Sequence, residues 1–373
     1  MNFNKFIIVI ITSFFLFFEI YSQKIKPLKI GEKAPYFELP GVDGKVYSLN
    51  DFNQSDILVI IFMSNYCPTS QAYEDKIIKM ANDFSNISIN FVAISPNKPE
   101  AILFEDQGYS DISDDFEEMK MRAKDKAFNF PYLYDGDKQE VSKAYGPQAT
   151  PHVFIFDKKR ILRYHGRFDN IENPYREPTQ RDARSAILAL FTNIEVIEKT
   201  TKTFGCPVKW DEDTIWKNKT DEDWNKKKVK LELIQIDKLE KLRNNFNDNI
   251  LLLYIWANID SSVDNDLQNI VKIHRIYNQR FFEVNSLAIK KSNFDSTLKL
   301  LKNNNAAIKN YIYTDEIDNE FILAIDNDWD GDTPYGLIIA PEGEIIYKWK
   351  GQVDILKIRK IIINEIGRYY AND

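Results

Sequence analysis

Cysteine is scarce in this sequence, and so are other residues on which many active sites depend. The chain has two cysteines, Cys67 and Cys206, and three histidines among 373 residues. Two thiols are too few to hold a chain of this length together as a disulfide scaffold. The histidines lack the paired spacing of metal ligands, so we expect no metal site. No glycine-rich phosphate loop, Ser-His-Asp order or paired-carboxylate motif stands out, and we expect no cofactor.

Long runs of one charge are also missing. The formal net charge is −7 and no long basic run occurs, so nucleic acid is not an expected partner. Beyond the N-terminus no segment approaches the length of a membrane span. With 44% hydrophobic and 28% charged residues, the composition is that of a soluble globular protein. The length suits two ordinary domains.

The apolar run at the N-terminus predicts the compartment. Lys5 precedes residues 6–18, which are apolar apart from two hydroxyl residues, and the small residue Ser22 follows. This pattern is typical of a secretory signal peptide, and the run is short for a bilayer span. We therefore predict a signal peptide at residues 1–22 and a mature protein in a periplasm or outside the cell. An uncleaved anchor is the alternative, whereas no nearby cysteine supports lipid attachment.

Cys67 stands where an apolar strand predicted at residues 57–62 gives way to an amphipathic helix. The apolar residues that recur on one face of this helix are Tyr73, Ile77, Met80, Ala81 and Phe84, and the charged residues expected off that face are Glu74, Asp75, Lys76 and Lys79. Pro68 suits the first helical turn. Unpaired N–H groups and the helix dipole favour a thiolate there. We expect a nucleophilic sulfur that solutes can reach; a small core hydrophobe is the alternative.

The rest of the first half alternates strands and helices. The strands are expected in a hairpin over 37–49 and at 87–94, 130–135, 149–157 and 161–167, and the helices at 116–127 and 181–190. This order indicates a layered α/β fold with a mixed sheet. The acidic stretch at 111–118 predicts a solvated loop or a helix start.

Several short motifs occur together in this half. They are Gly31-Glu32-Lys33-Ala34-Pro35, Asn65-Tyr66-Cys67-Pro68, Thr150-Pro151-His152 and Gly205-Cys206-Pro207. From about residue 30 to 210 the sequence resembles thioredoxin-fold redoxins of the alkyl hydroperoxide reductase and thiol-specific antioxidant family, and more narrowly their peroxiredoxin-like subgroup. The resemblance implies an oxidoreductase that acts through Cys67. It also implies a cis peptide bond at Pro151 beside Cys67, with a backbone edge left free to pair with a substrate peptide.

Departures from the family pattern limit the chemistry. Ser70 stands where dithiol reductases have a second cysteine, and a hydroxyl cannot displace a mixed disulfide. Ser64 keeps the hydroxyl found three residues before a peroxidatic cysteine, but Ile60 replaces the proline seven residues before it. Where the peroxide-orienting arginine is sought, the chain has Thr150-Pro151. Half of the peroxidatic signature is therefore missing.

Cys206 becomes the candidate resolving thiol, because the first domain has no other. Cys67 is expected to attack a disulfide, or a peroxide, and Cys206 or an external thiol then displaces the product. A structural disulfide between the two cysteines is the alternative. The expected partners are a disulfide- or thiol-bearing protein, a small thiol or a peroxide. A non-catalytic binding protein stays open, and the sequence predicts no oligomeric state.

Four polar residues near the two motifs are candidates for a supporting role. Ser64, Asn65 and Thr69 are candidate hydrogen-bond donors to the sulfur or to a bound oxygen, with surface capping as the alternative. His152 is a candidate for tuning Cys67, with a satisfied surface histidine as the alternative.

The second half repeats the pattern of the first without its sulfur. Strands are expected at 250–257, 282–289, 332–340 and 344–351, and Leu267, Ile270, Val271 and His274 share a helix face. This half resembles periplasmic thioredoxin-like oxidoreductases, whose two cysteines would fall at Asp260 and Val263. It is therefore predicted to be redox-inactive and to dock a partner, cover the first domain or assist dimerisation.

The predicted fold class is α/β, with two tandem thioredoxin-like domains that each have a mixed central sheet flanked by helices. We predict a signal peptide at 1–22, a redoxin domain at 27–210, a polar linker at 211–228 and a degenerate thioredoxin-like domain at 229–373.

Overall fold

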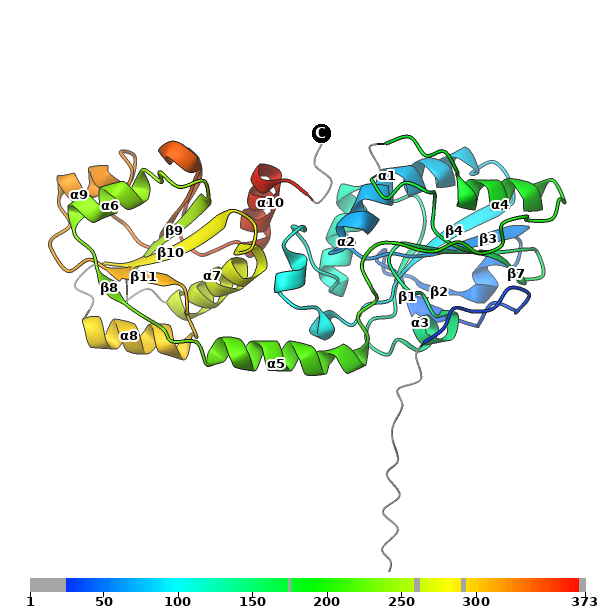
Figure 1. Cartoon of the computed structure of the whole chain (residues 1–373), viewed down its shortest axis with the longest axis horizontal. Helices are drawn as coiled ribbons and strands as arrows, with labels where there is room; N and C mark the ends of the chain where they lie inside the picture. Colours follow the sequence, from blue (N-terminus) through cyan, green and yellow to red (C-terminus); the bar gives the residue numbers. More distant parts are fainter. Residues whose placement is uncertain (1–24, 174–175, 258–261, 290–292, 369–373) are drawn as a thin grey trace, which may run out of the picture.

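The computed structural model describes residues 25–173, 176–257, 262–289 and 293–368, which form two α/β units (Figure 1). The predicted signal peptide at 1–22 lies outside the described residues. None of the helices in the described part of the chain combines the length and apolar character needed to cross a bilayer.

The first unit is built on a five-stranded sheet with the order β5-β4-β3-β6-β7. Its strands are β3 (Ile57–Phe62), β4 (Ile89–Ser95), β5 (Tyr132–Tyr134), β6 (His152–Phe156) and β7 (Leu162–Gly166). β3, β4 and β5 run parallel, whereas β6 is antiparallel to both β3 and β7. A separate hairpin pairs β1 (Glu38–Pro40) with β2 (Val46–Ser48). The mixed sheet predicted from the sequence is confirmed.

Helices and loops cover both faces of this sheet, so every residue of β3 is buried. The helices are α1 (Pro68–Asp83), α2 (Phe116–Asp125), α3 (Glu140–Tyr145) and α4 (Asp182–Phe191). Figure 1 shows α1 and α4 on one side of the sheet and α3 on the other. The buried face of α1 carries the apolar residues predicted for it.

The prediction that Glu74 lies off the buried face of α1 is wrong. Its side chain is fully buried and accepts two hydrogen bonds from Arg122 of α2, at 2.9 and 2.7 Å. The helix therefore has a second covered face, because α2 packs beside it. A buried charge needs such a partner, since an unpaired one costs several kcal/mol.

The second unit has a six-stranded sheet with the order β13-β12-β9-β10-β11-β8. Its strands are β8 (Glu232–Leu233), β9 (Ile250–Trp256), β10 (Phe282–Ala288), β11 (Lys309–Ile312), β12 (Tyr335–Ile339) and β13 (Ile345–Lys350), and its helices are α6 (Ile236–Arg243), α7 (Val263–Tyr277), α8 (Phe294–Asn303), α9 (Asn319–Ile325) and α10 (Ile355–Ile366).

The two units share a core topology. In the second sheet β9 is parallel to β10 and antiparallel to β12, and β12 pairs with β13. In the first sheet β3 is likewise parallel to β4 and antiparallel to β6, and β6 pairs with β7. Both units carry a cis Thr-Pro bond, Thr150-Pro151 and Thr333-Pro334, before the matching strand. The predicted α/β fold class, with a mixed central sheet in each of the two units, is confirmed. Asp260, where a cysteine would fall, lies outside the described residues.

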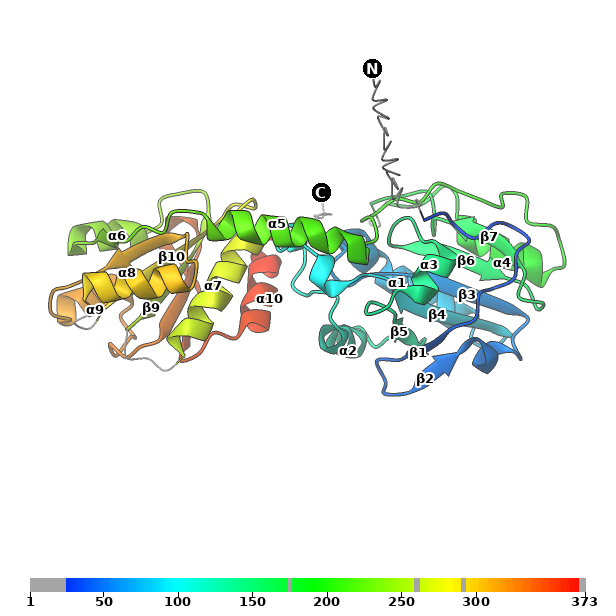
Figure 2. The same cartoon turned by 90° about the horizontal axis from the view of Figure 1, so that it is seen from below.

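The polar linker predicted at 211–228 is mostly helical. It contains the short 3-10 turn η4 (Asp211–Asp213) and α5 (Thr214–Asn225), which runs from one unit to the other in Figure 2. Trp224 near the end of α5 is buried in the second unit, where its indole N–H donates to the Asn305 carbonyl at 3.0 Å. The units also touch directly, because the turn η3 (Glu105–Gln107) of the first packs on α7 of the second.

Candidate functional site

Cys67 lies at the predicted strand-to-helix junction. It is the N-cap residue of α1, and its sulfur accepts the backbone N–H of Ser70 at 3.4 Å. Pro68 occupies the first helical turn, as its missing N–H allows. The Ser70 hydroxyl accepts the N–H of Ser64 at 3.3 Å and so ties the helix start back to the chain that leaves β3. The local sequence thus directs the backbone N–H of Ser70 at the sulfur.

The Thr150-Pro151 segment lies against the same sulfur. Thr150 precedes a cis proline, and the Cys67 thiol donates to the Thr150 carbonyl at 3.2 Å. The N–H of Thr150 donates to the carbonyl of Cys206 at 2.9 Å, and the two residues form an antiparallel bridge. The edge that the resemblance implied to be free is therefore occupied by the chain itself, which corrects that expectation.

Gly205 allows this close approach. Its φ of +116° lies in the region that favours glycine, and a Cβ there would lie 2.1 Å from the Thr150 carbonyl oxygen. The same Cβ would lie 3.4 Å from the Cβ of Thr69, which is buried beneath the segment. Next to it, the Phe204 ring packs at 6.2 Å from the Tyr73 ring of α1. The segment 204–206 is thus shaped to lie over Cys67.

The two thiols have opposite pKa shifts. Burial raises the pKa of Cys67, but hydrogen bonds from the Cys206 thiol, the Ser70 N–H, the Thr150 hydroxyl and the Cys206 N–H outweigh it and bring the pKa to about 6. The hydrogen bond to Cys67, together with burial, raises the pKa of Cys206. One sulfur therefore ionises near neutral pH while the other keeps its proton and donates it.

The expectation that solutes reach Cys67 is wrong for this state, because its side chain has no exposed surface. The sulfur is covered by polar groups of Thr150, Ser70 and Cys206 rather than by hydrocarbon alone. This environment argues against the alternative of a simple core hydrophobe. Cys206 is partly buried, and both cysteines are free thiols.

A buried carboxylate, Asp114, holds the loop before Cys67. It accepts the N–H groups of Asn65 at 2.5 Å and Tyr66 at 3.1 Å, and the side-chain amide of Asn97 at 2.6 Å. Burial raises the pKa of Asp114. The acidic stretch at 111–118 is predicted to be a solvated loop or a helix start; α2 does begin within it, at Phe116, but Asp114 is buried and not solvated. Sequence reasoning missed it because nothing in the acidic run distinguishes Asp114 from its neighbours.

Ser64 and Asn65 do not cap an exposed surface, since both are fully buried. The Asn65 side chain donates to the Ser113 carbonyl at 3.1 Å and accepts from the Tyr132 hydroxyl at 3.1 Å. Its hydrogen bonds therefore position the loop, and they do not reach the sulfur.

His152 is also buried, which corrects the alternative of a surface histidine. Its Nδ1 accepts the Gln148 N–H at 3.1 Å and its Nε2 lies 3.3 Å from Nδ1 of His165. Burial keeps the pKa of His152 well below its ordinary value, so the ring is neutral. Within the described ranges, no group of three His, Cys, Asp or Glu side chains is arranged to hold a metal ion.

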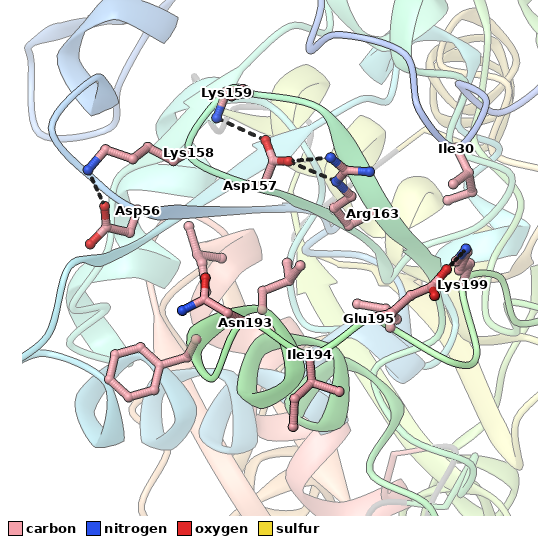
Figure 3. Close-up of a pocket in the computed structure, with 14 residues that line it drawn as sticks. Ile30, Asp56, Asp157, Lys158, Lys159, Arg163, Asn193, Ile194, Glu195 and Lys199 are labelled. Atoms are coloured by element: carbon pink, nitrogen blue, oxygen red, sulfur yellow. Dashed lines mark hydrogen bonds and ion pairs between the residues drawn. The ribbon is translucent and has the colours of Figure 1, made fainter.

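The cavity in Figure 3 is separate from the cysteines. It has a volume of about 810 Å³ and is lined by residues that include Ile57, Asp157, Arg163 and Ile194. Ile57 begins β3 and Asp157 follows β6, so the cavity lies at the end of the sheet opposite Cys67. A smaller cavity of about 450 Å³ adjoins the Cys206 segment, with Phe204, Gly205 and Pro207 in its lining.

Comparison with known proteins agrees with this geometry. The profile of the AhpC/TSA family matches residues 30–165. A Mycobacterium tuberculosis protein named "Putative peroxiredoxin" is 31% identical over 145 residues, which cover 38% of this chain and 78% of that protein.

Two solved structures are similar to about half of the chain. A hypothetical protein from Sinorhizobium meliloti 1021 is 31% identical and covers 50% of this chain and 96% of its own, with a TM-score of 0.45. An uncharacterized conserved protein from Geobacillus kaustophilus is 34% identical and covers 49% of this chain and 93% of its own, with a TM-score of 0.44. From the family profile and the sequence relative, the chain belongs to the AhpC/TSA family of redoxins and is an oxidoreductase.

Proposed function

We propose that this protein is an extracytoplasmic thiol–disulfide oxidoreductase in which Cys67 is the nucleophile and Cys206 the resolving thiol. The observation that carries the proposal is the antiparallel bridge between Thr150 and Cys206, which brings a second thiol into hydrogen-bond contact with Cys67. Ser70 cannot resolve a mixed disulfide, so Cys206 supplies the thiol that the C-x-x-C pattern would otherwise provide.

The reaction proceeds in two displacements. The Cys67 thiolate attacks one sulfur of a substrate disulfide, forming a mixed disulfide and releasing the other substrate sulfur as a thiolate. That thiolate takes the proton from Cys206. The Cys206 thiolate then attacks the Cys67 sulfur, which forms the Cys67–Cys206 disulfide and releases the second substrate thiolate. The substrate gains two electrons, and the two cysteines lose them.

The residues around the Cys67 sulfur assist the reaction through the hydrogen bonds they donate and the positions they fix. The Ser70 N–H and the Thr150 hydroxyl stabilise the thiolate as a nucleophile and as a leaving group. Pro68 starts the helix, and Pro151, Thr69 and Gly205 shape the surface on which the Cys206 segment lies. Ser64 and Asn65 fix the loop that carries Cys67.

Peroxide reduction is the second candidate, and the closed site favours it. A sulfur with no exposed surface is more easily reached by a small oxidant than by a protein disulfide. The Cys67 thiolate would attack the peroxide O–O bond, giving a sulfenic acid and an alkoxide or hydroxide that takes up a proton. Attack by Cys206 would then form the same disulfide and release water.

Thiol mapping of the oxidised mature protein tests both candidates. We expect mass spectrometry to find a Cys67–Cys206 disulfide after treatment with a model disulfide, and Cys206→Ser to trap the mixed disulfide on Cys67. Cys67→Ser should abolish both products. Faster oxidation by peroxide than by disulfide would select the second candidate. A Cys67 that stays reduced under both oxidants would contradict the proposal, leaving a non-catalytic binding protein, whereas Cys67 oxidation without a link to Cys206 would contradict only the resolving role.

The location outside the cytoplasm rests on residues 1–22. Cell fractionation followed by N-terminal sequencing should find a mature chain that begins near Gln23, in the periplasm or the medium. A cytoplasmic chain that retains Met1 would contradict it.

A further inference from the structure

We propose that Tyr277 and Arg368 of the second unit are positioning residues for Cys67, because their side chains hold both sides of the junction that carries its sulfur. This inference deepens the proposed function and rests on the role of Cys67 as nucleophile. It gives the half of the chain without cysteines a part in the chemistry of the other half.

Arg368 holds the helical side of the junction. It follows α10, and its guanidinium donates to the side-chain carbonyl of Gln71 and, at 3.0 Å, to the carboxylate of Asp111. Gln71 lies in the first turn of α1, where its N–H donates to the Cys67 carbonyl at 3.0 Å. The fork geometry of arginine suits two acceptors at once. One side chain of the second unit thus fixes the turn that begins at Cys67.

Tyr277 holds the strand side through Ser110. The Tyr277 hydroxyl donates to the Ser110 carbonyl at 2.8 Å, and the Ser110 hydroxyl, which donates to the Ile112 carbonyl at 2.7 Å, lies 3.3 Å from the Asn65 carbonyl oxygen. The side-chain amide of Gln71 donates to the Ser110 hydroxyl at 2.8 Å and also to the Asn65 carbonyl. Ser110 therefore lies between the two sides of the junction. These sides are Asn65, two residues before Cys67, and Gln71, four residues after it.

This contact is buried and polar. Ser110, Tyr277 and Arg359 have fully buried side chains, and Arg359 donates to Gln107 at 3.1 Å and to the Ser110 carbonyl at 3.4 Å. Buried polar groups that lose a partner cost free energy, so the network resists small displacements. The surface of the second unit consequently restricts where Asn65 and Gln71 lie.

The consequence for the sulfur follows from the Ser70 N–H. This donor lies between Cys67 and Gln71, and a shift of the first turn or of Asn65 changes its distance and direction to the sulfur. Hydrogen bonds weaken steeply as they bend. Loss of either positioning residue should therefore destabilise the thiolate relative to the thiol without removing any group that touches the sulfur.

A pH titration of the Cys67 thiolate by its ultraviolet absorbance tests the inference in the full-length mature chain. Cys67→Ser provides the background for each titration. We expect Arg368→Gln and Tyr277→Phe each to raise the Cys67 pKa by about one unit, so that about fivefold less thiolate is present at pH 6. Lys360→Gln is the matched control, because Lys360 pairs with Asp125 across the same two units, at 3.3 Å, on an exposed surface.

A wild-type thiolate near pH 6 with unchanged values in both variants would overturn this inference alone, whereas a wild-type Cys67 still protonated at pH 8 would overturn the proposed function. An equal shift in Lys360→Gln would show a general loosening and would also overturn the inference. Arg368 is partly exposed near the end of α10, so folding should survive its change. If Tyr277→Phe fails to fold, Arg368→Gln decides alone.

Discussion

The low pKa of Cys67 depends on donors from three parts of the chain. Ser70 follows it in α1, Thr150 precedes a cis proline, and Cys206 lies on a returning segment 139 residues away in sequence. A helix start was predictable from Pro68 and from the periodicity of α1. The approach of Cys206 was not, because sequence separation carries no information about where a long chain returns.

We expect the reaction of Cys67 with a disulfide to depend on pH in one direction. Its pKa is lowered to about 6, so the thiolate is present above that pH and is lost as the pH falls through it. The rate should rise from pH 5 to pH 7 and then level off. Stopped-flow measurement with a small aromatic disulfide checks this. A rate that keeps rising tenfold per unit up to pH 8 would show an ordinary thiol.

Removing the Cys206 thiol should destabilise the Cys67 thiolate relative to the protonated thiol. Cys206→Ala deletes the side-chain donor and should raise the Cys67 pKa by about one unit. Cys206→Ser keeps a hydroxyl donor and should raise it less. Thiolate absorbance titrations of the two variants give the comparison. Equal values in the wild type and in Cys206→Ala would exclude a contribution from the Cys206 side chain.

Asp114 should be a large contributor to stability. Asp114→Ala leaves two buried backbone N–H groups, of Asn65 and Tyr66, without their acceptor and should lower the free energy of unfolding by about 2–4 kcal/mol. Asp115→Asn is the control, since asparagine also caps α2 and should change stability by a few tenths of a kcal/mol. Urea denaturation measures both. Equal losses would contradict the assigned role.

At the scale of elements, the segment 204–206 behaves as a short added strand beside Thr150. Gly205→Ala places a methyl group against the Thr150 carbonyl and should displace the segment. We expect slower formation of the Cys67–Cys206 disulfide, by about tenfold or more, from strain of about 1–3 kcal/mol. Gly31→Ala is the control, because Gly31 has a similar φ of +92° but open space around it. Quenched-flow alkylation follows the reaction.

The elements that sequence patterns predicted are those with strong periodicity. β3 and β9 are continuous apolar runs in which every residue is buried, and α1 and α7 each have a clear apolar face that is buried. α5 was predicted only as a polar linker, because its one buried residue, Trp224, makes no periodic pattern. Glu74 was misplaced for a related reason, since one sequence does not show that α2 covers a second face of α1.

At the scale of the molecule, we expect the ion pairs between the two units to contribute to the free energy of unfolding. Arg275 of α7 pairs with Glu105 at 2.9 Å and with Asp221 of α5 at 2.7 Å, and its own side chain is buried. Arg275→Ala leaves the partly buried Glu105 carboxylate without its partner, whereas Asp221 keeps Lys217, and the change should cost about 3 kcal/mol. Lys79→Ala removes an exposed pair with Asp83 and should cost at most about 1 kcal/mol. Chemical denaturation of both variants checks the contrast.

Because of the bridge between Thr150 and Cys206, the Cys206 thiol competes with dissolved thiols for reaction with oxidised Cys67. A tethered group acts at an effective concentration that is in the millimolar range for a short flexible connection, and a group already docked in place exceeds it. Once Cys67 has reacted, Cys206 would react with it faster than dissolved thiols whose concentration is below this effective concentration. Covalent intermediates with substrate would therefore be short-lived, and the protein would leave each encounter in a single oxidised form.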